Sequence, residues 1–384
     1  MRIVLACALA LSAGCGGAAK AAPAAPRPQA PPAPAPRATP PAEAATPPAP
    51  EPPPAPHQRI TVAAVGDIMM GTTYPAEALP PEDGDQLLAA VAPTLRAADI
   101  TFGNLEGPLY DGGGDGKCAA VVKRHRKKQT CWAFRSPTRY VGHLVEAGFD
   151  VVSIANNHAW DFGEAGRAST IATLENAGIA YSGPPGTVAT LHAGNMRIGL
   201  IAFTTANHSH NLNDLDTAVA AVRAADKDHD LVIVSFHGGA EGRTHQHVPE
   251  GPEMFYGENR GDLRTFTHAV IDAGADLVLG HGPHVLRGME VYKGHLIVYS
   301  MGNFVTYRGI SIKGPAGITA ILTVDVAPDG RFLGGKLTPL LQKRPEGPMP
   351  DPRGRAIPLV RSLSRADFPG TAARVGDDGT LSAP

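Results

Sequence analysis

The sequence predicts an α/β fold, with a largely parallel or mixed sheet that is covered by helices on both faces. From residue 59 onward, short apolar runs alternate with segments of helical periodicity, which is the order expected for repeated βα units. The apolar runs are hydrophobic throughout instead of alternating, as is typical of strands that are buried on both faces. Polar side chains cluster where these runs end, and open α/β sheets place their ligands at that edge.

The expected elements follow one another along the chain. The run ITVAAVGD (60–67) is apolar up to a terminal Gly-Asp pair, as in a buried strand that leads into a loop. Similar runs predict strands at 99–106, 149–158, 196–204, 230–239, 275–284, 295–304 and 317–328. Helical periodicity predicts helices at 85–98, 137–148, 165–178, 217–226 and 260–274. From residue 346 to 384 we expect a C-terminal helix within PRGRAIPLVRSLS, followed by a flexible tail.

The N-terminal segment predicts export. A short basic start, Met1-Arg2, precedes an apolar run that has the length of a signal peptide and is too short for an ordinary membrane span. The run ends in small residues before Cys15, a pattern similar to a bacterial lipobox. We therefore expect a signal peptide over 1–14 and a lipid anchor on Cys15, with simple secretion as the alternative. Gly16 after the cysteine favours the outer membrane, on its periplasmic face, if the cell is Gram-negative.

Residues 15–58 contain a long stretch that is almost entirely Ala and Pro. Such a stretch favours polyproline II and cannot build a core, so we expect a semi-rigid spacer between the anchor and the folded domain. The formal net charge of −2, without any nucleic-acid-binding motif, argues against nucleic acid as a partner.

Two cysteines, Cys118 and Cys131, flank a basic run. In an exported protein they are more readily a disulfide than a metal site, because no further cysteines complete a zinc set. The run KRHRKK (123–128) is either a solvated loop or a group of cations for an anionic polymer or lipid head groups.

Five of the predicted strands end in carboxylate, amide or imidazole side chains. Any one of these has an ordinary explanation as a turn former, a helix cap or a surface histidine. Together they predict a mixed nitrogen and oxygen site for one or two divalent ions, Mn, Fe or Zn. Two ions about 3.5–4 Å apart can clamp a tetrahedral phosphate and activate a bridging water. The side chains are Asp67, Asn104, Glu106, Asn156, Asn157, His158, His237, Glu241, His281 and His284.

Several of these segments resemble a known family. AAVGDIMMG, FGNLEGPL, SIANNHAWDFG, SFHGGAE and LGHGPHVLRGMEVYKGHLIVYSMGNF resemble CapA-type proteins, which take part in bacterial capsule or poly-γ-glutamate synthesis. These proteins are placed in the calcineurin-like metallophosphoesterase superfamily. The resemblance implies a CapA-type domain over 59–345, built as a β-sandwich of two mixed sheets flanked by helices in four layers, αββα.

The resemblance also implies roles for individual residues. His158 is expected to act as a general acid or electrostatic stabiliser, oriented by Asp161. Two positions depart from the superfamily pattern: Met69 stands where a histidine is usual, and His281 and His284 lie three apart, where the family's pair lies closer together. These departures predict a weaker, single-metal or differently shaped shell. The implied metal ligands are Asp67, Glu106, Asn157, His237, His281 and His284, and the implied substrate-binding residues are Asn104, Glu241, Arg287 and Asn303.

The expected function is that of a lipid-anchored protein of capsule or poly-γ-glutamate synthesis or retention. Its expected partners are an anionic polymer such as poly-γ-glutamate, the membrane through the lipid, and membrane proteins of capsule synthesis. Two alternatives remain open: an active metal-dependent phosphoesterase with an unrelated small-molecule or polymer substrate, and a metal-free binding lipoprotein. The sequence leaves enzymatic activity undecided.

Overall fold

The structure is a computed structural model that describes residues 59–119 and 131–384. The predicted signal peptide, the Cys15 anchor, the spacer and the KRHRKK run lie outside the described residues. Among the residues that are described, no helix is long and apolar enough to cross a membrane.

Sheet 1 has ten strands and is mixed. Strands β1 to β4 run parallel to one another in sequence order, and β14 joins β1 in the same direction. Strands β15 and β16 continue the sheet antiparallel on the other side of β1. The bounds are β1 Ile60–Met69, β2 Ile100–Leu105, β3 Val151–Ser153, β4 Ala180–Ser182, β14 Asn303–Thr306, β15 Ile318–Val326, β16 Phe332–Lys343, β17 Gly347–Pro350, β18 Arg374–Val375 and β19 Thr380–Ser382.

Sheet 2 has seven strands and is also mixed. Its centre is parallel, in the order β13-β11-β8-β6, and antiparallel strands β12 and β5 lie outside it. A separate two-stranded hairpin, β9–β10, lies in the segment that connects β8 to α6. The bounds are β5 Ala189–Ala193, β6 Met196–Thr204, β7 His210–Asn211, β8 Leu231–His237, β9 Met254–Phe255, β10 Glu258–Asn259, β11 Leu277–His281, β12 Met289–Tyr292 and β13 His295–Val298.

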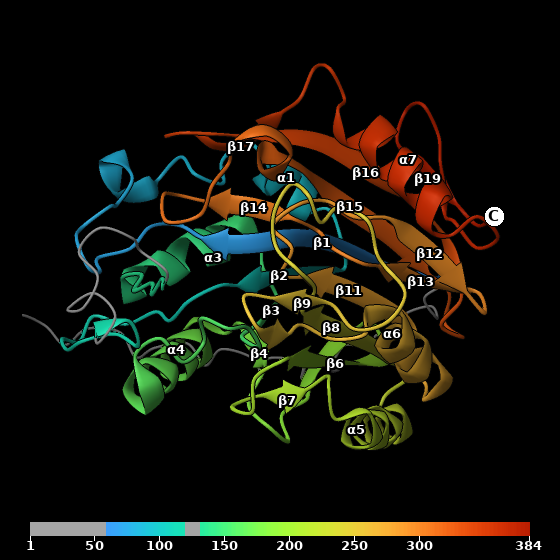
Figure 1. The fold of residues 1–384 in the computed structure, drawn as a ribbon, viewed down its shortest axis with the longest axis horizontal. Coiled ribbons are helices and arrows are strands. Elements are labelled where there is room, and N and C mark those ends of the chain that lie inside the picture. Colours follow the sequence, from blue (N-terminus) through green and yellow to red (C-terminus); the bar gives the residue numbers. More distant parts are fainter. Residues whose placement is uncertain (1–58, 120–130) are drawn as a thin grey trace, which may run out of the picture. The chain divides into compact units, whose positions relative to one another are not determined.

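The two sheets pack face to face between layers of helices (Figure 1). Side chains such as Phe102 of sheet 1 and Leu279 of sheet 2 form one buried cluster between them. Helices α3 (Val141–Ala147) and α4 (Gly163–Ala177) share a second cluster with the outer face of sheet 1. Helices α5 (Leu215–Asp228) and α6 (Leu263–Asp272) share a third with the outer face of sheet 2. The predicted four-layer αββα architecture is therefore confirmed.

Helix ends follow the local sequence. Asp214 and Asp262 cap α5 and α6, because each side chain accepts a hydrogen bond from a backbone N–H in the first turn. Gly148 and Gly178 end α3 and α4 in the left-handed conformation, with φ of 87° and 73°, which glycine adopts without a Cβ clash. The helix expected at 85–98 is the one wrong helix prediction. The structure has a 3-10 turn (Pro81–Gly84) and the single turn α1 (Ala92–Leu95), because Pro93 has no N–H and breaks a longer helix.

The C-terminal segment also differs from the prediction. Helix α7 (Ala356–Asp367) is present as expected and buries Val360 in the cluster between the sheets. The expected flexible tail is wrong, because β19 pairs antiparallel with β16, and β18 pairs with β19. Residues from 346 onward thus complete the edge of sheet 1. Two further 3-10 turns lie at Thr138–Tyr140 and Gly314–Gly317.

Candidate metal centre

Parallel strand order brings the polar strand ends together. In sheet 1, Asp67 on β1 lies opposite Asn104 on β2, and Glu106 follows β2 directly. In sheet 2, His281 at the end of β11 lies opposite His237 at the end of β8. Because these strands are parallel within each sheet, their carboxyl ends lie at one edge. The two edges meet where Nδ1 of His281 lies 3.3 Å from Oδ1 of Asp67.

Three of the predicted ligands form the centre of the site. Asp67, Glu106 and His237 each offer one ligand atom, and these atoms all lie within 4.8 Å of one another. Nε2 of His237 lies 3.5 Å from Oε1 of Glu106. All three residues are at most 1% exposed. Two buried carboxylates and a buried imidazole are a donor set that suits a divalent transition metal.

The two histidines of the GHGPH turn complete the surroundings. His284 lies between both carboxylates, with Nδ1 2.9 Å from Oδ2 of Asp67 and Nε2 3.5 Å from Oε1 of Glu106. Its backbone is left-handed, with φ of 59°, a conformation that non-glycine residues adopt mainly at turns and functional sites. Gly282 permits the close packing of the β8 and β11 loops, because a Cβ there would lie 2.5 Å from the carbonyl oxygen of Gly238. The turn therefore delivers both imidazoles to the site.

The centre contains buried polar atoms that the protein itself does not satisfy. Both carboxylate oxygens of Glu106 and both ring nitrogens of His237 and of His281 lack a hydrogen-bond partner among the described residues. Buried polar atoms are normally paired, and an unpaired one costs about 1–3 kcal/mol. A bound cation would satisfy several of these atoms at once, so the residues present fit a metal ion.

The ionisable side chains of this centre form a tightly packed charge cluster. Burial raises the pKa of Glu106 to about 8. Burial also works to lower the pKa of His284, but the carboxylates of Glu106 and Asp67 outweigh it and raise that pKa to about 10. The pKa of Asp67 is shifted in the opposite direction. Burial works to raise it, but contacts with His281 and His284 outweigh burial and hold it far below the usual range. Burial keeps the pKa of His237 well below 6.5, so its ring is neutral and able to bind a metal.

The predicted catalytic pair lies beside this centre. Nδ1 of His158 is 2.8 Å from Oδ2 of Asp161, and the His158 ring packs against Phe134 with ring centroids 4.3 Å apart. Asp161 is held from two further sides, by the backbone N–H of Phe134 at 2.6 Å and by Nζ of Lys117 at 2.7 Å. The same Lys117 ammonium donates to the carbonyl of Asn157 at 2.7 Å.

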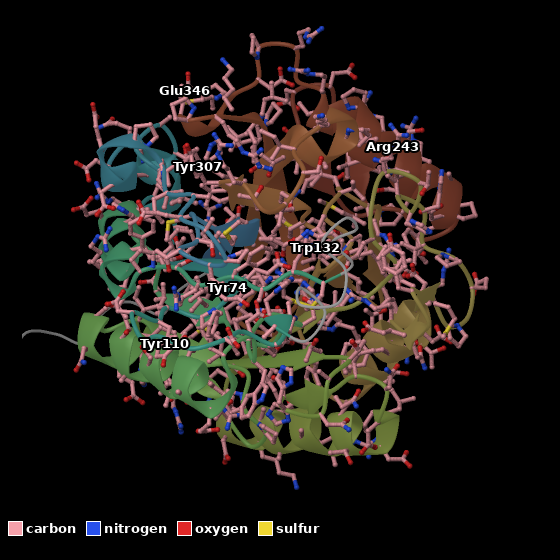
Figure 2. All side chains as sticks on the ribbon, turned by 60° about the vertical axis from the view of Figure 1, so that its left-hand side comes forward. Tyr74, Tyr110, Trp132, Arg243, Tyr307 and Glu346 are labelled. Carbon is pink, nitrogen blue, oxygen red and sulfur yellow. A yellow bond between two sulfur atoms is a disulfide. The ribbon has the colours of Figure 1, made fainter. Side chains whose placement is uncertain are left out.

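A disulfide joins the two segments that hold Asp161. Cys118 and Cys131 are bonded, as the sequence predicted, and Lys117 precedes Cys118 directly. Phe134 lies three residues after Cys131. Trp132, which lies between them, is 40% exposed (Figure 2). Lys117 was not among the predicted site residues, and its position beside a crosslinked cysteine is the only sequence signal that could have indicated its role.

Buried amides connect the pair to the metal centre. Asn104 donates from Nδ2 to Oδ1 of Asp67 at 2.9 Å and accepts at Oδ1 from Nδ2 of Asn156 at 3.1 Å. Oδ1 of Asn156 in turn accepts from the backbone N–H of His158 at 3.1 Å. Asn104 therefore orients Asp67, and its expected role in substrate binding stays a prediction. Asn157 is half-buried, and its Oδ1 lacks a hydrogen-bond partner among the described residues, as a free ligand atom would.

Two other expected substrate-binding residues are used inside the protein. Arg287 is fully buried, and its guanidinium makes two 2.8 Å hydrogen bonds to Glu253 and two more to the carbonyls of His245 and Ala240. Arg287 therefore supports the loop after β8, and its expected role in substrate binding stays a prediction. Nδ2 of Asn303 donates to three backbone carbonyls, although its Oδ1 is unpaired among the described residues.

Glu241 lies at the rim of the site. Its side chain is 25% exposed, and Oε1 is 3.2 Å from Nη1 of Arg260. The other three expected substrate-binding residues are fully buried, so Glu241 is the one of the four whose side chain remains partly open to solvent.

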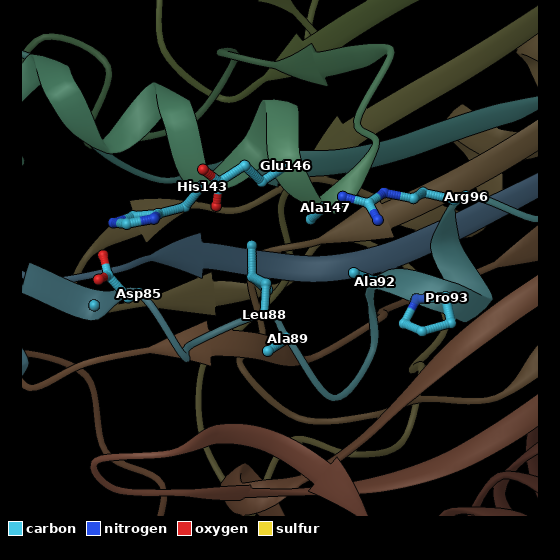
Figure 3. Close-up of a pocket in the computed structure, with 10 residues that line it drawn as sticks. Asp85, Leu88, Ala89, Ala92, Pro93, Arg96, His143, Glu146 and Ala147 are labelled. Atoms are coloured by element: carbon cyan, nitrogen blue, oxygen red, sulfur yellow. The ribbon is translucent and has the colours of Figure 1, made fainter. Parts of the chain in front are cut away.

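A separate pocket of about 290 Å³ lies between residues 84–96 and α3. Its polar lining comes from Asp85, Arg96, His143 and Glu146 (Figure 3). None of the predicted site residues lines it. The metal centre must therefore be assigned from its own buried side chains.

Comparison with known proteins identifies relatives for most of the described chain. The family model for "Bacterial capsule synthesis protein PGA_cap" matches residues 61–308. The capsule biosynthesis protein CapA of Bacillus anthracis is 29% identical over 273 residues, which cover 66% of this chain and 61% of that protein. The PGA biosynthesis protein CapA of Bacillus subtilis (strain 168) is 28% identical over 268 residues, with 65% and 64% covered. The chain thus spans less than two thirds of the length of these relatives.

Among solved structures, a 5'-nucleotidase precursor from Thermus thermophilus is similar at a TM-score of 0.41 and 14% identity. The match covers 80% of this chain and 59% of the nucleotidase. A similarity of this size carries no conclusion about chemistry, which must come from the site itself.

Proposed function

Because the chain belongs to the family of bacterial capsule synthesis proteins, we propose that it acts in the synthesis or retention of an anionic polymer such as poly-γ-glutamate and binds one or two divalent ions. The observation that carries the metal assignment is the buried group of Asp67, Glu106 and His237. Its members converge within 4.8 Å, and the ring nitrogens of His237 and the oxygens of Glu106 lack partners among the described residues.

The side chains divide the work of such a site. Asp67, Glu106 and His237 would hold the ion, with His281, His284 and the Asn157 side-chain oxygen as further donors. A bound divalent ion supplies Lewis acidity and an activated water at neutral pH. His158 lies beside the centre with Asp161 on Nδ1, so its Nε2 is the atom that would give a proton to a leaving group.

The decisive experiment measures bound metal. Purified wild type and the Asp67→Ala/His237→Ala variant are loaded with Mn²⁺, Fe²⁺ or Zn²⁺, desalted and subjected to elemental analysis. The matched control is His192→Ala/Asp216→Ala, which removes an exposed histidine and an exposed aspartate. We expect wild type and control to retain metal and the site variant to lose it. Equal metal in all three proteins, or none in the wild type, would contradict the proposal.

The presence of His158 and Asp161 favours a second candidate, an active phosphoesterase. Turnover of bis-p-nitrophenyl phosphate by the metal-loaded wild type separates the two candidates. Turnover that the site variant lacks supports the enzyme, whereas retained metal without turnover supports a binding or scaffolding role.

We also propose that the protein is exported and anchored through a lipid on Cys15. The basic start, the apolar run and the small residues before Cys15 support this, and the disulfide suits an oxidising compartment. Metabolic labelling with a palmitate analogue should mark the wild type in its membrane fraction. Cys15→Ser should abolish both the label and the membrane association, and a labelled Cys15→Ser protein would contradict the anchor.

A further inference from the structure

Arg260 is a buried arginine that none of the roles described so far uses. It follows β10 directly and is only 2% exposed. Its carbonyl accepts from the backbone N–H of Gly239 at 2.7 Å, and its Nε donates to the Gly239 carbonyl at 3.1 Å. Gly239 is two residues beyond His237, so Arg260 is attached to the loop that leaves the metal centre.

The backbone of Arg260 packs closely on this loop. A Cβ on Gly238, the residue directly after His237, would lie 2.8 Å from the carbonyl oxygen of Arg260. Glycine at this position is therefore needed for the approach. These short contacts of the Arg260 backbone with Gly238 and Gly239 fix the position of Arg260 relative to His237.

Two of the three guanidinium nitrogens of Arg260 have partners among the described residues, and the third does not. Nη1 faces two carboxylates, Glu241 at 3.2 Å and Glu258 at 3.8 Å. Nη2 is buried and lacks a hydrogen-bond partner among the described residues. Arginine stays charged at all ordinary pH values, so this donor cannot be neutralised by losing a proton. Nε and Nη1 hold the side chain in place, whereas Nη2 has no structural task.

A second buried arginine nearby shows what structural pairing looks like in this fold. Arg287 lies on the other side of Gly239, where a Cβ would meet its Nη1 at 2.9 Å. Both of its terminal nitrogens bond to Glu253 at 2.8 Å. The two arginines share one loop, yet only Arg260 keeps an unpaired terminal nitrogen.

The charge of Arg260 reaches the metal centre. Burial dominates the raised pKa of Glu106, and Arg260 is among the charges that work to lower it. Burial likewise lowers the pKa of His237, and among the neighbouring charges that add to this effect Arg260 is the largest. The guanidinium therefore lies within electrostatic range of two of the candidate ligands.

We propose that Arg260 is a substrate-binding residue whose Nη2 donates to an oxyanion of the ligand, phosphate or carboxylate, held beside the metal centre. A guanidinium is the side chain best suited to such oxygens, because its N–H groups are planar and fixed in direction. Glu241 has the complementary task of orienting Nη1. The inference rests on the proposed function, since it supplies the anion-binding half of the same site.

The test measures anion binding in place of turnover. The full chain, loaded with Mn²⁺, is titrated calorimetrically with inorganic phosphate and, separately, with glutarate. Arg260→Met removes the donor, and Arg243→Met is the matched control, an exposed arginine of the neighbouring loop (Figure 2). The ratio of the two wild-type affinities tells whether phosphate or carboxylate is the preferred ligand. Manganese content is determined for every sample.

We expect Arg260→Met to retain its metal and to bind the preferred anion about 10- to 100-fold more weakly, with Arg243→Met unchanged. Anion affinity equal to that of the wild type in Arg260→Met overturns the inference, as does a metal-loaded wild type that binds neither anion. A wild type without manganese contradicts the proposed function instead, and the same titrations of the metal-free protein then decide on Arg260. If Arg260→Met fails to fold, a structure of the wild type soaked with phosphate and glutarate decides: an anion oxygen must lie within about 3.2 Å of Nη2.

Discussion

The imidazole of His158 and the carboxylate of Asp161 form a buried pair, with Nδ1 of the ring 2.8 Å from Oδ2 of the acid. A carboxylate on Nδ1 fixes the tautomer and the orientation of a histidine and makes it more basic. Burial nevertheless lowers the pKa of His158 overall, with Asp161 working in the opposite direction. The ring is thus mostly neutral at pH 7 but has a partner that stabilises its protonated form.

Replacing Asp161 by Asn should therefore uncouple proton transfer from metal binding. We expect Asp161→Asn to keep its metal and to lower phosphodiester turnover about 10- to 100-fold. The control is Glu164→Gln, an exposed carboxylate at the start of α4. Nitrogen NMR of His158 gives a readout that is independent of turnover, because the Asn variant should lose the strong Nδ1–H bond. Unchanged turnover together with an unchanged tautomer would contradict the role of Asp161.

Metal binding should release protons. The pKa of Glu106 is raised to about 8 and that of His284 to about 10, so this coupled pair holds one or two protons at pH 7 before an ion binds. These protons must leave when the pair binds an ion, so affinity for Mn²⁺ should rise as the pH rises from about 6 to about 8. Calorimetry in buffers of different ionisation enthalpy should report about one to two protons released per ion, and fewer in Glu106→Gln. Affinity that does not change with pH would contradict this account.

Arg287 should matter for stability and not for ligand binding. Arg287→Met leaves the Glu253 carboxylate buried without its partner, which we expect to lower the free energy of unfolding by about 3–5 kcal/mol. The double variant Arg287→Met/Glu253→Gln should recover part of this loss, because no charge is left unpaired. Urea unfolding measures both values. A single variant of nearly wild-type stability with weakened anion binding would restore the substrate-binding role that the sequence suggested.

Asp276 gives stability a pH dependence away from the metal centre. It lies between α6 and β11, accepts from the N–H of Val232 at 2.7 Å, and burial raises its pKa from 3.8 to about 6. The folded state holds the proton of the Asp276 carboxyl more tightly than the unfolded chain does. The stability that this protonation adds is therefore fully present below pH 3.8 and is lost as the pH rises through about 6. Asp276→Asn should therefore be more stable than wild type at pH 7.5, by about 1–3 kcal/mol, and nearly equal to it at pH 3.5. Thermal unfolding at both pH values checks the difference, and an equal shift at both would contradict it.

Strand order made the centre of the site predictable. The apolar runs that end in Asp67, His237 and His281 are buried strands, and parallel pairing places their ends together whatever the loops do. The Asn-His pair at 157–158 and the GHGPH turn could be placed for the same reason. The disulfide could be predicted because an exported chain is oxidised and no further cysteines complete a zinc set with Cys118 and Cys131.

The features that the sequence did not predict depend on contacts between segments that are distant along the chain. Arg287 was expected to bind substrate because the family resemblance implied it, but its partner Glu253 belongs to a hairpin base far from it in sequence. Arg260 was missed for the same reason, since nothing near it in sequence shows that it docks on Gly239. Strand β16 contains Gly334, Gly335 and Pro339, which hide a strand pattern, and without β16 the pairing of β19 could not be foreseen.

The disulfide between Cys118 and Cys131 makes the arrangement around His158, the candidate proton donor, depend on cysteine oxidation. Besides His158, Asp161 contacts Lys117 and the backbone N–H of Phe134. Lys117 lies directly before Cys118, and Phe134 lies three residues after Cys131, so the disulfide joins the two segments that hold Asp161. A chain that folds where thiols stay reduced would still have Asp67, Glu106 and His237, which lie on strands or directly after one, but Asp161 would be held loosely. Metal loading and maturation of the proton donor would then be separate events, the second completed only where the cysteines can be oxidised.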